Sequence, residues 1–181
     1  ILNDSHAEVL ARRGFIRYIY EQIEYALKSE DSIFSLNENK EIFLKPNIHF
    51  HFFSSHLPCG DASILKNSEI SVDEFPLVQN TGAKCINDDL DSTNDRLDPL
   101  LGQVRRKPGR GDPTLSVSCS DKLARWIRLG FQGALIDILL SRPLTVQTII
   151  IANDNPLCKD SLNRALFDRA TSNVENNDQN E

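Results

Sequence analysis

The sequence predicts a layered α/β domain, because helical and strand-like segments alternate along its 181 residues. Three observations support this prediction. Apolar residues recur at helical spacing over residues 6–28, aromatic residues are frequent in the extended segment 41–55, and a continuous apolar run fills residues 145–152. A continuous run is typical of a strand that is covered on both faces. A composition of 40% hydrophobic and 25% charged residues fits a globular protein.

The elements follow in order from local signals. Asp4 or Ser5 is expected to cap the helix over residues 6–28, and a polar turn at 37–40 precedes the extended segment. Pro-Cys-Gly at residues 58–60 ends that segment and opens a short helix, since proline fits the start of a helix. The later expectations are a short strand at 114–119, a helix at 122–130 capped by Ser120 or Asp121, and helices at 132–140 and 160–171 whose inward residues include Leu162, Ala165 and Leu166.

An acidic insertion interrupts this pattern at about residues 69–112. It lacks apolar periodicity and is rich in Asp, Asn, Gly, Pro and Ser. Between Glu69 and Asp98 it holds eight acidic residues against two basic ones, which accounts for the whole net charge of −6. The rest of the chain is therefore neutral overall, and a basic face for nucleic acid stays compatible with the composition.

The cysteine content favours a reduced, intracellular protein of the nucleus or cytoplasm. Four cysteines are widely spaced along the chain, without the dense spacing of disulfide-rich secreted domains. No apolar stretch approaches the roughly 18 residues of a transmembrane helix, so no membrane partner is expected. In this setting, separated Cys and His residues are candidate metal ligands or buried thiols.

Three such residues lie at predicted helix starts. His6, Cys59 and Cys119 each open a helix, where the aligned amides favour a thiolate over a thiol. One His and two Cys leave the fourth tetrahedral position of zinc open, as in catalytic zinc sites, and zinc lowers the pKa of a water there to about 7. Glu8 lies two residues after His6 and can reach that water without being a ligand.

His-x-Glu followed by Pro-Cys is the pattern of zinc nucleobase deaminases. Those enzymes usually have a second Cys three residues after the first, but this chain has Ala62 there. Another residue must then supply the third ligand. Cys119 is favoured over Cys85, because Cys85 lies in the acidic insertion with no helix start behind it.

Longer strings around these residues resemble the adenosine deaminases that act on RNA. The three matching strings are LNDSHAE at residues 2–8, FFSSHLPCGDAS at 52–63 and SCSDKLARW at 118–126. Two further strings, GAKC at 82–85 and KPGRGD at 107–112, resemble the branch of this family that acts on tRNA. The chain has Ile127 and Arg128 where the family usually has Asn after the Trp.

The resemblance implies a three-layer α/β/α fold of the cytidine-deaminase type with a mixed sheet. It implies that His6, Cys59 and Cys119 bind zinc and that Glu8 moves protons. It also implies a buried inositol hexakisphosphate, faced by the cations Arg12, Arg13, Lys122 and Arg125, with Asn3 and Trp126 as weaker candidates and Asp4 linking Lys122 to the metal site. Burying these cations without a counter-anion would be costly.

The resemblance further implies deamination of adenosine to inosine in tRNA, beside the anticodon on its 3′ side, with tRNA-Ala as the expected substrate and no obligate protein partner. Residues 1–172 are expected to form this domain, incomplete at both ends because the family's domain is longer, and residues 173–181 a polar tail. The basic residues that close the insertion are candidates for holding the tRNA backbone: Arg105, Arg106, Lys107 and Arg110.

Three alternatives stay open. The same chemistry could edit another RNA. The chain could be an inactive RNA-binding module stabilised by zinc and inositol phosphate. A free cytidine could be the substrate, although the absent second Cys after Cys59 and the Arg12–Arg13 pair argue against it.

Overall fold

The computed structural model describes residues 4–65, 101–102, 104–105, 116–152 and 158–168. The chain divides into two compact units. The first unit comprises Ser5–Phe53 and Trp126–Ile150, and the second comprises Ile1–Asp4, Ser54–Arg125 and Ile151–Glu181. Each unit has its own packing.

The first unit is built on the long helix α1 (Ala7–Leu27). The sequence prediction of this helix is confirmed, but the predicted cap is wrong. His6 is the N-cap, and neither Asp4 nor Ser5 caps the helix, because the Asp4 carboxylate accepts hydrogen bonds from Lys122 and Ser116 instead. The carbonyl of His6 accepts the first amides of the helix, from Val9 and Leu10, each at 3.0 Å.

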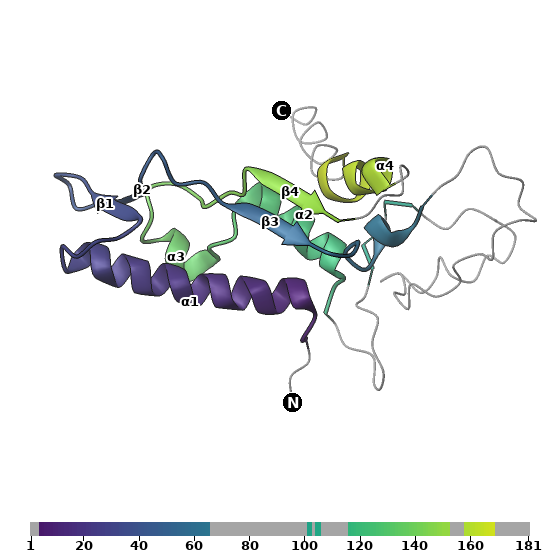
Figure 1. Cartoon of the computed structure of the whole chain (residues 1–181), viewed down its shortest axis with the longest axis horizontal. Coiled ribbons are helices and arrows are strands. Elements are labelled where there is room, and N and C mark those ends of the chain that lie inside the picture. Colours follow the sequence, from purple (N-terminus) through teal and green to yellow (C-terminus); the bar gives the residue numbers. More distant parts are fainter. Residues whose placement is uncertain (1–3, 66–100, 103, 106–115, 153–157, 169–181) are drawn as a thin grey trace, which may run out of the picture. The chain divides into compact units, whose positions relative to one another are not determined.

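A hairpin missing from the sequence prediction packs beside α1. Strands β1 (Phe34–Leu36) and β2 (Ile42–Leu44) pair antiparallel, with Ser35 opposite Phe43, on either side of the predicted polar turn. Gln22 of α1 ties the hairpin to the helix, because its carbonyl accepts from the Ser32 hydroxyl at 2.6 Å and its side chain accepts from the Ile33 amide at 3.0 Å. Figure 1 shows β1 and β2 near the C-terminal end of α1.

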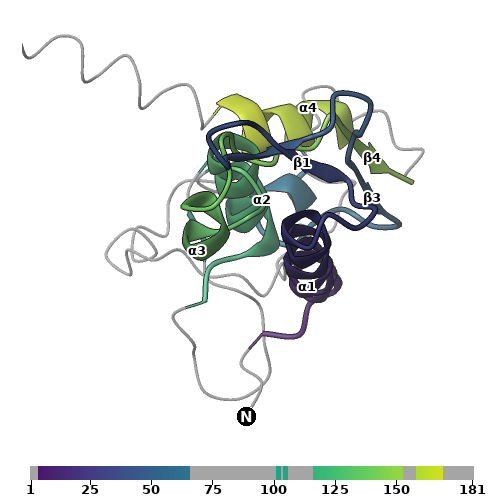
Figure 2. The same cartoon turned by 90° about the vertical axis from the view of Figure 1, so that its left-hand side faces the viewer.

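The core of the first unit lies between α1, the hairpin and α3 (Ala134–Asp137). Viewed nearly along α1, β1 and α3 lie beside the helix (Figure 2). The predicted helix at 132–140 is therefore real but shorter. Gln132 is 3% exposed and precedes it, donating to Asp137 at 2.6 Å and accepting from the Leu144 amide at 2.8 Å. The buried cluster is Ile19, Ile23, Ala26, Phe34, Ile42, Ile136 and Leu144.

The predicted long extended segment is two strands separated by a turn. After β2, the chain resumes extended structure only at β3 (His51–Ser54), which forms a second two-stranded sheet with β4 (Thr148–Ile151). The prediction that β4 is covered on both faces is wrong in this structure, because Ile150 is 47% exposed. The apolar run of residues 145–152 does correctly predict the strand itself.

The second unit contains the segments that follow β3 and β4. A short 3₁₀ turn, η1 (Asp61–Ser63), packs against α4 (Cys158–Leu162) and the π-helical turn η3 (Asn163–Asp168). The predicted helix at 160–171 thus begins two residues earlier and widens into a π turn, with Ala165 and Leu166 buried as predicted. The Ser161 hydroxyl donates to the Ala62 carbonyl at 3.0 Å and fixes α4 on η1.

These elements confirm the predicted mixed α/β class. Most of the predicted insertion, Cys85, Asn3 and the tail at 173–181 lie outside the described residues. The predicted strand at 114–119 is a single bridge at Val117 in its described part. No described helix combines the length and the apolar character that a membrane span requires.

Candidate metal centre

Helix α2 (Cys119–Leu129) begins at a predicted metal ligand. The predicted start at residue 122, with Ser120 or Asp121 as the cap, is wrong. The Ser118 hydroxyl accepts from the Asp121 amide at 3.3 Å and donates to the Asp121 carboxylate at 2.5 Å, so Ser118 caps the helix. Cys119 therefore occupies the first turn, where amide N–H groups have no partner within the helix.

Cys59 lies against this helix start. Its sulfur accepts a hydrogen bond from the Cys119 amide at 3.3 Å, and its carbonyl accepts from the Ser120 amide at 3.0 Å and the Ser120 hydroxyl at 2.8 Å. An amide that donates to sulfur favours the thiolate, which is the form that binds a metal. Cys59, Cys119 and Cys158 form no disulfide in the described part of the chain.

The close approach of the two segments depends on Gly60. Its φ is 101°, a positive backbone angle that residues other than glycine rarely adopt. A Cβ atom built on Gly60 would overlap the Ser118 side chain, lying 2.6 Å from its Cβ. The absence of a side chain at residue 60 therefore lets the loop carrying Cys59 meet the helix carrying Cys119.

We expect Gly60→Ala to lower the free energy of unfolding by about 3 kcal/mol, because it adds backbone strain and a steric overlap. Gly14→Ala is the matched control. Gly14 lies within α1 with nothing within 4 Å of its Cβ position, so alanine there should raise stability by about 0.5–1 kcal/mol. Urea unfolding of both variants measures the difference, and equal stabilities would contradict this role of Gly60.

Asp61 is a buried charge that the sequence analysis did not identify. It is 0% exposed, and its carboxylate accepts from Arg164 Nε at 3.0 Å and from the Gly102 amide at 2.8 Å. Arg164 also donates to the carbonyls of Asp61 and Ile64, at 2.9 and 2.7 Å. A paired and hydrogen-bonded charge avoids the large cost of burial, so this network fixes the loop that follows Cys59.

Arg105 does not present its side chain as a predicted tRNA contact. It is 7% exposed, and its backbone amide donates to Asp121 at 3.0 Å while its carbonyl accepts from the Ser118 amide at 2.8 Å. The end of the predicted insertion is thus part of the structure around α2. Arg106, Lys107 and Arg110 lie outside the described residues.

The structure brings the three predicted ligands together. One imidazole nitrogen of His6 and the sulfurs of Cys59 and Cys119 all lie within 4.8 Å of one another. Cys119 is 0% exposed, and His6 and Cys59 are partly buried. Ligands about 2.0–2.3 Å from a zinc ion lie at such separations, so the donor set and its spacing fit a zinc ion with one open position.

Glu8 lies in the first turn of α1 and is partly buried. It follows His6 by two residues, so the helix start that carries the imidazole also carries the carboxylate. Within the described residues, the group of metal-ligating side chains that lie close enough to share an ion does not include Glu8. Glu8 thus lies near His6 along the chain but outside the group of three candidate ligands.

The predicted phosphate-binding cations have different surroundings. The Arg12 guanidinium lies 5.0 Å from the centre of the Trp126 ring, within cation–π distance. The Lys122 ammonium donates to Asp4, to the Ser116 hydroxyl at 2.8 Å and to the Val117 carbonyl at 2.8 Å. The Asp4–Lys122 contact of the predicted link to the metal site is therefore present. Arg13 and Arg125 are exposed.

Comparison with known proteins agrees with the geometry. The chain matches the adenosine-deaminase (editase) domain family over residues 1–180. It is 43% identical to tRNA-specific adenosine deaminase 1 of Drosophila melanogaster, over 93% of this chain and 43% of that protein. The corresponding protein of Mus musculus is 31% identical, over 93% of this chain and 52% of its own length. The double-stranded RNA-specific editase Adar of Drosophila melanogaster is 29% identical, over 84% of this chain and 24% of its length.

The chain spans about half or less of the length of these curated relatives. The match nevertheless covers nearly all of its own residues, including all three predicted ligands and Glu8. We conclude that the chain belongs to the adenosine-deaminase (editase) domain family.

Proposed function

We propose that this protein is a zinc-dependent adenosine deaminase that converts adenosine to inosine in tRNA, beside the anticodon on its 3′ side. The observation that supports it most is the His6–Cys59–Cys119 cluster, with Glu8 two residues from His6. Family membership supports adenosine as the target. The preference for tRNA rests on the 43% identity to the tRNA-specific relative of Drosophila melanogaster, against 29% and 31% to double-stranded RNA-specific editases.

In this proposal the ligands of zinc are His6, Cys59 and Cys119. When bound, zinc would act as a Lewis acid that makes an attacking water more acidic. Glu8 accepts a proton from this water as its oxygen attacks C6 of adenine, and protonates N1. Glu8 then moves a proton to the leaving amine, and ammonia departs. The net reaction consumes one water and yields inosine, so one carboxylate can serve as base and then as acid.

We also propose inositol hexakisphosphate as a structural cofactor, with Arg12, Arg13, Lys122 and Arg125 as its cationic surroundings. Arginine forks match phosphate oxygens well, which favours the three arginines as direct ligands. The three N–H groups of Lys122 already have acceptors in the protein, so Lys122 would contribute its charge more than a hydrogen bond. The use of tRNA-Ala and a location in the nucleus or cytoplasm remain predictions.

We expect removal of zinc from the complete protein with a chelator to abolish inosine formation, and added zinc to restore it. Metal content is measured by mass spectrometry, and inosine by nucleoside analysis of digested tRNA. Full inosine formation by metal-free protein would refute the zinc mechanism. Uridine formed from cytidine, with no inosine, would refute the assigned substrate.

A further inference from the structure

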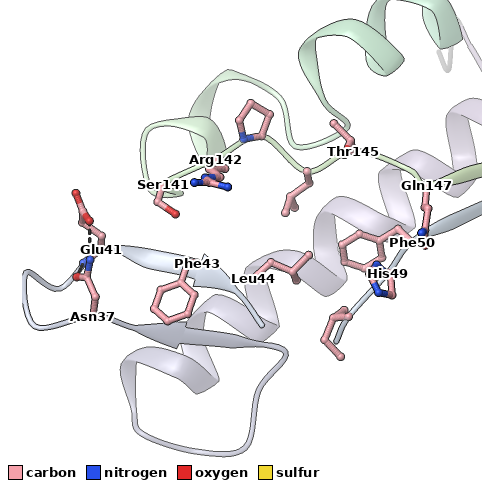
Figure 3. Close-up of a pocket in the computed structure, with 13 residues that line it drawn as sticks. Asn37, Glu41, Phe43, Leu44, His49, Phe50, Ser141, Arg142, Thr145 and Gln147 are labelled. Atoms are coloured by element: carbon pink, nitrogen blue, oxygen red, sulfur yellow. Dashed lines mark hydrogen bonds between the residues drawn. The ribbon is translucent and has the colours of Figure 1, made fainter. Parts of the chain in front are cut away.

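The first unit contains a pocket that the deamination mechanism does not use. Its volume is about 660 Å³, within the ~300–1,000 Å³ range of ligand-binding pockets. It lies between the segment Asn37–Phe50 on one side and residues 141–147 on the other (Figure 3). The lining residues are Asn37, Glu41, Phe43, Leu44, Ile48, His49, Phe50, Ser141, Arg142, Pro143, Leu144, Thr145 and Gln147.

Two backbone hydrogen bonds hold the pocket walls together at its ends. The Ser141 amide donates to the Ile42 carbonyl at 2.9 Å, and the Gln147 amide donates to the Phe50 carbonyl at 2.8 Å. Between these two bonds the two wall segments line the pocket. Three lining residues are also held by core packing: Leu144 belongs to the buried cluster of the first unit, and Leu44 and Phe50 pack against it. The protein's own contacts therefore hold the walls of the pocket in place.

The lining combines an aromatic surface with a cation. Phe43 is 36% exposed, so its ring is accessible from the pocket. Arg142 is exposed and has no carboxylate partner among the described residues. The acidic residue of the lining, Glu41, accepts a hydrogen bond from the side-chain amide of Asn37 at 2.6 Å, and Figure 3 shows this pair at the same end of the pocket as Ser141 and Arg142. The remaining polar groups of the lining are imidazole, hydroxyl and amide: His49, Ser141, Thr145 and Gln147.

This chemistry suits one class of ligand. An exposed aromatic ring stacks on an unpaired nucleobase, an arginine fork binds a phosphate, and hydroxyl and amide groups bind base edges and ribose. We propose that the pocket binds a single-stranded nucleotide of the RNA substrate, with the base on Phe43 and a phosphate at Arg142. This proposal rests on the proposed function, because it takes RNA as the substrate.

The pocket nucleotide is not the target adenosine. The pocket adjoins β2 and the C-terminal half of α1, where Ile19 and Ile23 support its floor, whereas His6 precedes the N-terminal end of α1. Ile19 follows His6 by 13 residues, which corresponds to about 20 Å along a helix. An RNA nucleotide in the pocket would therefore lie several nucleotides away from the base at His6, so the pocket would position the substrate without taking part in the reaction.

The test compares three variants of the complete protein for affinity to a tRNA transcript at several salt concentrations. Arg142→Ala is expected to weaken binding about fivefold. It should also lower by about one the number of counterions released on binding, as loss of one phosphate contact predicts. Phe43→Leu keeps apolar volume but removes the ring, and is expected to weaken binding at least about fivefold with an unchanged salt dependence. Arg17→Ala removes the same charge from an exposed position on α1 outside the pocket, and should change affinity less than about twofold.

Thermal unfolding checks that each variant is folded. At saturating RNA, Arg142→Ala and Phe43→Leu should both show the wild-type kcat. Equal affinities of the Arg142 and Arg17 variants, or an unchanged affinity of Phe43→Leu, would overturn the proposal. The binding measurement needs no turnover. Failure of the pocket is therefore distinguishable from failure of the proposed function, which would appear as a wild-type protein that forms no inosine.

Discussion

Glu8→Gln is expected to reduce inosine formation by at least about 1,000-fold while the protein keeps its zinc. Glutamine has nearly the same shape as glutamate but cannot accept a proton from water or pass it on, and general acid–base catalysis contributes about 10²–10⁴-fold for a positioned group. Here one group would serve as both base and acid, which places the expected loss in the upper part of that range. Single-turnover inosine formation in saturating tRNA, together with metal content, measures both results.

The matched control is Glu21→Gln, which makes the same chemical change at an exposed position of the same helix. Glu21 accepts a hydrogen bond from the Tyr25 hydroxyl at 3.0 Å and lies more than three helical turns from Glu8. Its variant should keep wild-type activity. Loss of zinc from Glu8→Gln would mean that Glu8 is a metal ligand, and normal activity would end its assignment as the proton carrier.

The sequence predicted correctly the long helix and the approach of His6, Cys59 and Cys119 to one another, because both depend on strong local signals. The helical periodicity extends over the 21 residues of α1, which is almost six turns, so propensity and packing agree along the helix. His6, Cys59 and Cys119 each stand at a helix start or in a tight turn, where the backbone conformation limits which residue types occur. The motif strings then indicated which distant segments meet.

Contacts between residues far apart in the chain explain most of the errors. Asp4 is a good helix cap by local rules, but Lys122, 118 residues later, binds its carboxylate in the folded chain. Asp61 and Arg164 are 103 residues apart, and neither stands in a pattern that predicts the other. The hairpin was different, because a local signal could have identified it: apolar, β-favouring residues stand on both sides of the predicted turn, at Phe34–Leu36 and at Ile42–Leu44.

Cys119→Ser is expected to have the second large effect, a loss of at least about 100-fold in zinc affinity. The serine hydroxyl is a harder and weaker ligand for zinc than a thiolate. Cys119 is also fully buried, so a side chain on the surface cannot reach its position to take its place. Because ligand binding stabilises the folded state, the variant should also unfold at a lower temperature than the zinc-loaded wild type. Zinc competition with a chromogenic chelator and thermal unfolding measure these effects.

Cys158→Ser separates this effect from a general need for buried thiols. Cys158 is 5% exposed, and burial raises the pKa of its thiol, which disfavours the thiolate that a metal requires. It lies in α4, and the described ligand cluster does not include it. The Cys158 variant should therefore lose some stability through packing while it keeps wild-type zinc affinity and the sulfur-to-metal charge-transfer absorption of cobalt-substituted protein. Cys119→Ser should weaken that absorption, since one of two sulfur ligands is gone, and equal spectra for the two variants would mean that Cys119 does not bind the metal.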